Sequence, residues 1–159
     1  MTISTEGLEE LNKMLAKLGD KAQDVASASL FKGAGVVADA MKGAANHIAT
    51  EPFKGKRMYG TRLPSPEEKA AVEGKTGIAK FRKSGGAVDT LIGVAKDAGY
   101  VQLGNRKAPV AAIARSINSG TSFMRKQPVF RRAASQAAPA AQAAVVAKAE
   151  EMFNEIINS

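Results

Sequence analysis

The chain has 159 residues, of which 45% are hydrophobic and only 5% aromatic, and its formal net charge is +8 at pH 7. This length and composition predict one folded domain, residues 1–159, with a thin core in which alanine is prominent. The absence of Cys excludes disulfides, a thiol nucleophile and thiolate metal ligands. No apolar run approaches the length of a membrane span and no signal peptide is recognisable, so no membrane partner is expected.

The positive charge lies in the middle of the chain. Residues 1–74 carry ten basic and ten acidic side chains, whereas residues 75–132 carry twelve basic and two acidic ones. Residues 133–159 carry one basic and three acidic ones. A basic segment favours a polyanion or an acidic protein surface as partner, although a solvated basic face without any ligand also fits the charge alone.

The first 50 residues predict two helices. Ser4 is a candidate N-cap for the first helix, and Gly19-Asp20 is expected to end it and to cap the second, which continues to about Thr50. Leucines form one helical stripe in the first helix: Leu8, Leu11, Leu15 and Leu18. The second helix has a face of small residues, which predicts close packing against the alanine-rich C-terminal segment.

Residues 51–75 predict a long polar loop with one short helix. Ser65 is the expected N-cap, Pro66 occupies the first helical position, and Gly74 closes the helix. We expect the loop to become ordered against a neighbouring subunit, through sparse apolar side chains that include Phe53 and Tyr59.

Alternating apolar residues predict a small antiparallel sheet in the basic segment. A strand over 88–94 is expected to form a hairpin with 100–103, and the segment from Pro109 to Ile117 is the predicted next strand after a turn at 104–107. Residues 131–159 predict an alanine-rich helix, in which Pro139 either produces a kink or marks the true start. The predicted fold class is α+β, with long N-terminal helices and an alanine-rich C-terminal helix packed on a small antiparallel β-sheet.

Residues suited to catalysis are sparse. His47 is the only His and has no acidic neighbour in the sequence, and Ser119–Ser122 lacks the glycine spacing and the Lys of a phosphate-binding loop. Gly33–Ala38 matches a dinucleotide-binding fingerprint on paper, but its flanks are helical where a strand is required. We therefore predict no enzyme activity, no cofactor, and no catalytic or metal-binding residues.

Three segments carry a resemblance to a known family. Residues 117–132 contain Gly120-Thr121-Ser122, Met124, Gln127-Pro128 and Phe130 before the C-terminal helix. This order resembles the head–tail joining, or tail-completion, family of long-tailed, lambda-like bacteriophages, whose usual pattern is Gly-Thr-Ser, Met and Gln-Pro-Phe ahead of such a helix. Gly7–Leu11 and Thr76–Ser84 resemble two further segments of that family, in the same order along the chain. The resemblance implies that residues 51–75 are a loop insertion relative to the family.

The resemblance implies a structural virion protein of the phage neck. Such a protein forms an oligomeric ring that joins or completes the tail at the head–tail interface, without catalysis. Its partners would be copies of itself and the adjacent connector and tail proteins, with non-specific contact to passing duplex DNA. It would reside in the virion, at the head–tail junction or tail, and in the host cytoplasm during assembly. The alternative function is a basic nucleic-acid-binding module that contacts the DNA backbone non-specifically, although it lacks the interleaved aromatics that single-strand binding needs.

Two sets of residues are candidates for contact with these partners. The expected subunit-interface residues lie mostly around the Gly-Thr-Ser turn: Gly120, Thr121, Ser122, Met124, Arg125, Lys126, Arg131 and Arg132, with Phe53 and Tyr59. The expected residues of a DNA-lined lumen lie on or beside predicted strands and turns: Lys80, Arg82, Lys83, Arg106 and Lys107.

Overall fold

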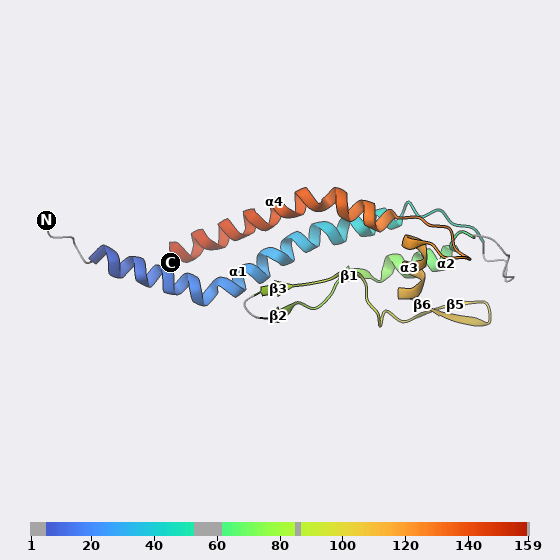
Figure 1. Cartoon of the computed structure of the whole chain (residues 1–159), viewed down its shortest axis with the longest axis horizontal. Coiled ribbons are helices and arrows are strands. Elements are labelled where there is room, and N and C mark those ends of the chain that lie inside the picture. Colours follow the sequence, from blue (N-terminus) through green and yellow to red (C-terminus); the bar gives the residue numbers. More distant parts are fainter. Residues whose placement is uncertain (1–5, 53–61, 85–86, 159) are drawn as a thin grey trace.

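The computed structural model describes the backbone of residues 6–52, 62–84 and 87–158, and side chains in these ranges other than residues 6–18, 20 and 84. Phe53 and Tyr59, like Ser4, lie outside the described residues, and the leucine stripe lies outside the described side chains. Figure 1 shows an elongated molecule in which two long helices, α1 (Glu6–Ala45) and α4 (Val129–Ile157), lie side by side. Shorter elements lie along α1 and at the end where α4 begins, so the predicted α+β class is confirmed.

The sequence predicts that a face of small residues on α1 packs against α4, and at Gly33 of that face α1 meets Ala141 and Val145 of α4. At Gly33 the helices approach so closely that an added Cβ would lie 2.4 Å from Val145 Cγ2 and 2.9 Å from the Ala141 carbonyl oxygen. Pro139 lies inside α4, so it does not mark the start of the helix.

The prediction of two N-terminal helices is wrong. One helix runs unbroken from Glu6 to Ala45, and Gly19-Asp20 lies within it. A glycine inside a helix costs only about 1 kcal/mol relative to Ala, whereas a break would forfeit several backbone hydrogen bonds. The helix also ends earlier than expected, because a turn at Asn46 and His47 follows Ala45.

The short helix of the insertion forms as predicted. α2 (Pro66–Gly74) starts at a capping box, in which the Ser65 hydroxyl accepts the Glu68 amide and the Glu68 carboxylate accepts the Ser65 amide. Glu68 is buried and accepts two 2.6 Å hydrogen bonds from the Arg62 guanidinium. Hydrogen bonding to Glu68 raises the pKa of Arg62 above its usual value, and partial burial opposes that rise.

Residues 76–84 and 87–94 are the two antiparallel arms of one hairpin along α1 (Figure 1). β1 (Thr76–Ile78) pairs with β4 (Ile92–Val94), and β2 (Arg82–Ser84) pairs with β3 (Ala87–Asp89). Between these ladders residues 79–81 face only residues 90–91, which is the extra residue of a β-bulge. The predicted strand over 88–94 therefore exists as one interrupted arm, and its partner is the 76–84 segment.

The predicted pairing of 88–94 with 100–103 is wrong. β5 (Tyr100–Leu103) instead pairs with β6 (Arg106–Pro109) across the turn that the sequence predicts there, with Gly104 at φ 59°. The strand predicted from Pro109 to Ile117 is also wrong, because α3 (Val110–Ser119) is a helix. Its buried residues Val110, Ile113 and Ile117 follow helical spacing. The alanines of this segment alternate and therefore also fit a strand, which explains the strand prediction.

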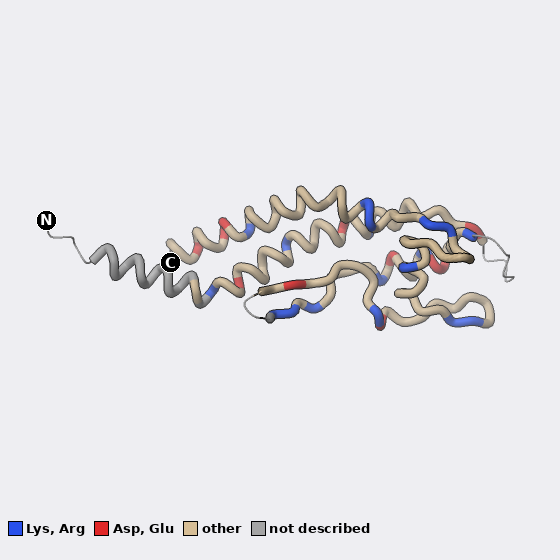
Figure 2. The backbone as a smooth tube through the Cα atoms, viewed as in Figure 1, with Lys and Arg blue, Asp and Glu red and all other residues tan. Residues whose placement is uncertain are grey.

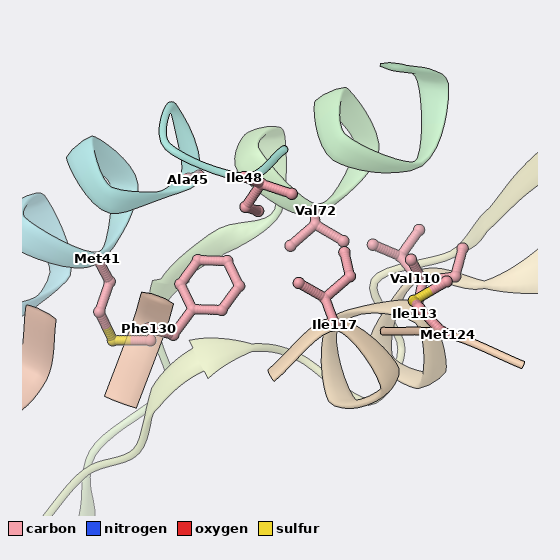
Figure 3. Close-up of a cluster of buried hydrophobic side chains, with 9 residues drawn as sticks. All are labelled: Met41, Ala45, Ile48, Val72, Val110, Ile113, Ile117, Met124 and Phe130. Carbon is pink, nitrogen blue, oxygen red and sulfur yellow. The ribbon is translucent and has the colours of Figure 1, made fainter. Parts of the chain in front are cut away.

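The principal hydrophobic core lies where α1 ends and α4 begins. Figure 3 shows side chains from α1, α2, α3, α4 and the connecting loops in one cluster. Its buried members are Met41, Ala45, Ile48, Val72, Val110, Ile113, Ile117, Met124 and Phe130. Two of them, Met124 and Phe130, belong to the segment that carries the family resemblance, so the core fixes the position of that segment.

Candidate interaction site

The loop between α3 and α4 starts with a residue that must be glycine. Gly120 has φ 77°, and its amide donates to the Ser116 carbonyl at the end of α3. A Cβ at this position would lie 2.9 Å from the Cβ of Lys126. Both the backbone angle and the space exclude a side chain here.

Thr121 closes the turn that follows. Its hydroxyl accepts the Met124 amide at 3.0 Å, and its own amide donates to the Met124 carbonyl at 2.9 Å. Met124 is thereby directed into the core, where it is 1% exposed. The backbone of Arg62 pairs with the same loop in a parallel bridge. The Arg62 amide donates to the Phe123 carbonyl, and the Arg62 carbonyl accepts from the Arg125 amide.

Gln127 joins the loop to the end of α1. Its side-chain oxygen accepts the Ala49 amide at 2.8 Å, and its side-chain nitrogen donates to the Ala49 carbonyl at 3.1 Å. Its backbone amide donates to the Ile117 carbonyl at 2.7 Å. Each residue of the Gly-Thr-Ser-x-Met-x-x-Gln order apart from Ser122, which is exposed, therefore has a defined role in shaping the loop.

This fixed loop exposes a group of cations. Arg125, Lys126, Arg131 and Arg132 are all exposed, and within the described ranges no salt bridge involves them. Phe123, in the same loop, is 51% exposed despite its size. We call these five residues the basic loop surface.

An open hollow of about 420 Å³ lies beside the basic loop surface. Its lining combines three of the cations with polar residues and no carboxylate: Asn118, Ser119, Lys126, Pro128, Arg131, Arg132 and Ser135. Asn118, Ser119 and Ser135 were not among the predicted site residues, since nothing in the sequence shows that the end of α3 faces the first turns of α4.

The predicted lumen residues lie on a different side of the molecule. Arg82 and Lys83 belong to β2, Lys80 to the bulge before it, and Arg106 and Lys107 to the start of β6, and all five are exposed. Figure 2 shows the basic residues of β2 and of the β5–β6 hairpin on the side that faces away from α4. Lys83 lies 3.7 Å from Asp24 of α1, a solvent-exposed contact. The two predicted sets are therefore separated in space.

Features of other site classes can be assessed in the same part of the chain. His47 is exposed. Among the described residues, no three His, Cys, Asp or Glu side chains are grouped to hold a metal ion. None of the described helices is long and apolar enough to cross a membrane.

Comparisons with known proteins return no matching family model, curated protein or solved structure.

Proposed function

We propose that the chain is a structural subunit of a phage neck, which assembles into a ring and joins or completes the tail without catalysis. The observation that carries the proposal is the construction of the loop from Gly120 to Gln127. Gly120, Thr121, Met124 and Gln127 each hold the backbone in place, and the side chains left exposed are those of Ser122, Phe123, Arg125 and Lys126. A rigid display of charge suits a contact between proteins, in which position and register matter.

The thin core is a second argument for assembly. Several large apolar side chains are exposed in the described chain, among them Leu91, Tyr100 and Phe123. Exposed aromatic residues are enriched at protein–protein interfaces. A subunit that buries such residues only against its neighbours fits the proposed ring.

Removal of the gene from the phage that encodes it tests the proposal. We expect filled heads and separate tails in electron micrographs of the lysate, and complementation by the wild-type chain should restore joined particles. A variant with Arg125, Lys126, Arg131 and Arg132 all replaced by Gln should fail to complement. Joined, infectious particles without the gene would refute the proposal.

The alternative function, non-specific binding to the DNA backbone, has one observation in its favour. The exposed cations of β2 and the β5–β6 hairpin share the side away from α4 (Figure 2), and Arg106 and Lys107 make no described ion pair. Phosphates attract such a surface without any base contact. This function is compatible with the first, since a neck ring surrounds passing DNA.

A further inference from the structure

The charges of α4 oppose its dipole at both ends. The N-terminal end of a helix carries partial positive charge, yet the first turn of α4 contains Arg131 and Arg132 and no acidic residue. The C-terminal end carries partial negative charge, yet the last turn contains Glu155 and no basic residue, and Glu150 lies in the turn before it. Opposite charge from outside the molecule would relieve both ends.

The acidic end of α4 also carries partly exposed apolar side chains, of which Phe153 also lines a hollow with Val25 of α1 and Val88 of β3. Val146, Phe153 and Ile157 are 55%, 39% and 45% exposed. Together with exposed Glu150 they occupy positions i, i+4, i+7 and i+11, which share one face of a helix. We call Val146, Glu150, Phe153 and Ile157 the α4 stripe. Lys148 pairs with Glu151 at 2.7 Å and also attracts Glu155, and these three residues lie on the opposite side of the helix from the stripe. No described salt bridge involves Glu150.

The basic loop surface has the matching composition. It offers exposed Phe123 together with four cations that make no described salt bridge, beside a hollow without carboxylates. The α4 stripe offers exposed apolar side chains around a carboxylate. One chain therefore displays both halves of a mixed apolar and charged contact, at opposite ends of α4 (Figure 2).

We propose that the α4 stripe of one copy docks on the basic loop surface of a second copy, with Glu150 facing Lys126, Arg131 and Arg132. The contact is head-to-tail, so each copy uses one surface toward each neighbour. Such contacts form a ring when the rotation between neighbours closes, and a filament when it does not. That the contacts close into a ring rests on the proposed function, whereas the identity of the two surfaces rests on their charge and exposure.

The charges favour a head-to-tail contact over a symmetric contact, in which the same surface of each copy would meet. Two stripes facing each other would bring two Glu150 carboxylates together, and two basic loop surfaces would oppose eight cations. Like charges across an interface are strongly unfavourable. DNA would likewise be repelled by the stripe, so a second copy is the partner that satisfies both surfaces.

Charge reversal at each surface tests the contact. One variant carries Glu150→Arg, and the other carries Arg131→Glu and Arg132→Glu. A matched control for the second, Arg106→Glu with Lys107→Glu, makes the same change of charge on the β5–β6 hairpin. Sedimentation velocity of the full chain at low salt should show wild-type self-association, weakened at least about tenfold in each reversal and unchanged in the control.

Mixing the two reversal variants is the decisive step. In the first variant both surfaces are basic, and in the second Arg131→Glu and Arg132→Glu place two carboxylates beside Arg125 and Lys126. Alternating copies again bring opposite charges together at positions 131, 132 and 150, so the equimolar mixture should regain association. Because the chain has no Cys, single-cysteine variants provide a second measurement for weak association. Lys126→Cys mixed with Glu150→Cys should form mixed disulfides in preference to either self-pair, whereas Lys107→Cys with Glu150→Cys should not.

The outcomes separate this inference from the proposed function. A mixture that fails to associate, a control as damaging as the reversals, or the absence of preferential disulfides would overturn the head-to-tail contact. Reversal variants that still complement the gene deletion would likewise overturn it while leaving the neck function intact. Restored association in the mixture, combined with joined particles in the deletion, would support the contact and refute the neck function.

Discussion

At Gly33 the backbones of α1 and α4 come so close that even a methyl group does not fit. Val145 is β-branched and therefore stiff, and the second contact is a backbone oxygen, so neither neighbour can move cheaply. We expect Gly33→Ala to lower the free energy of unfolding by about 1–3 kcal/mol, as overpacking does. Urea denaturation measures the change.

Gly35 provides the matched control on the same helix. A Cβ there meets nothing within 4 Å. Gly35→Ala should therefore stabilise the chain by up to about 1 kcal/mol through helix propensity. Equal effects at the two glycines would contradict the described approach of the helices.

Glu68 is the second residue at which a single change should be costly. It is 1% exposed and accepts from both the Arg62 guanidinium and the Ser65 amide. Glu68→Gln should lower the free energy of unfolding by about 2–3 kcal/mol. This is less than the cost of breaking a fully buried ion pair, because the Arg62 side chain is 25% exposed. Glu73→Gln, in the last turn of the same helix, should change the thermal unfolding free energy by less than about 0.5 kcal/mol. The pair would be unimportant if both variants melted alike.

Among the elements, the loop before α4 is joined to the segment that follows α1 by the side chain of Gln127. Gln127→Ala removes both hydrogen bonds to Ala49, with an expected decrease in stability of about 1–2 kcal/mol. Amide hydrogen exchange at Ala49 should accelerate, because its acceptor is removed. Gln142→Ala, at an exposed position on α4, should leave that exchange rate unchanged. Unaltered protection of Ala49 in the Gln127 variant would show that the loop is held by other contacts.

The elements that could be predicted from the sequence are those with local signals. The Ser65–Pro66 start of α2 and the small-residue face of α4 are encoded within a few turns, and both are found. The strand assigned to 109–117 failed because Val110, Ala112 and Ala114 also fit a helix whose buried residues are Val110, Ile113 and Ile117. The pairing of the 88–94 arm with 76–84 has a local signal that the hairpin prediction passed over, because Gly85-Gly86 separates the two arms by two residues of a type favoured in hairpin turns.

For the whole molecule, the cations of the hairpins should determine any DNA affinity. If Lys80, Arg82, Lys83, Arg106 and Lys107 face phosphates, duplex binding will be weak, independent of sequence and sensitive to salt. Replacing all five by Gln should reduce the slope of log K against log salt by about 0.9 for each phosphate that is no longer neutralised. The quadruple Gln variant of Arg125, Lys126, Arg131 and Arg132 should retain the slope, and fluorescence anisotropy compares them. If the quadruple variant lowered the slope and the hairpin variant did not, the four cations near α4 would face DNA and the hairpin cations would not.

The candidate site could be predicted only in part. The cations and the Gly-Thr-Ser turn are visible in the sequence, and so is the division into two basic groups. The hollow between α3 and α4, the exposure of Phe123 and the α4 stripe could not be predicted, since they depend on how the helices pack. The charged residues of α4 are visible in the sequence. That they lie at the unfavourable ends of the helix dipole can be recognised only when the bounds of the helix are known.

The copy number of the chain in intact particles tests the central claim most directly. Quantitative mass spectrometry of purified virions, combined with native mass measurement of the neck released from them, gives both abundance and assembly state. The proposed function predicts several copies per particle, recovered together as one closed oligomer from the head–tail junction. A chain that is absent from the particle, or present there as a single copy, would contradict it.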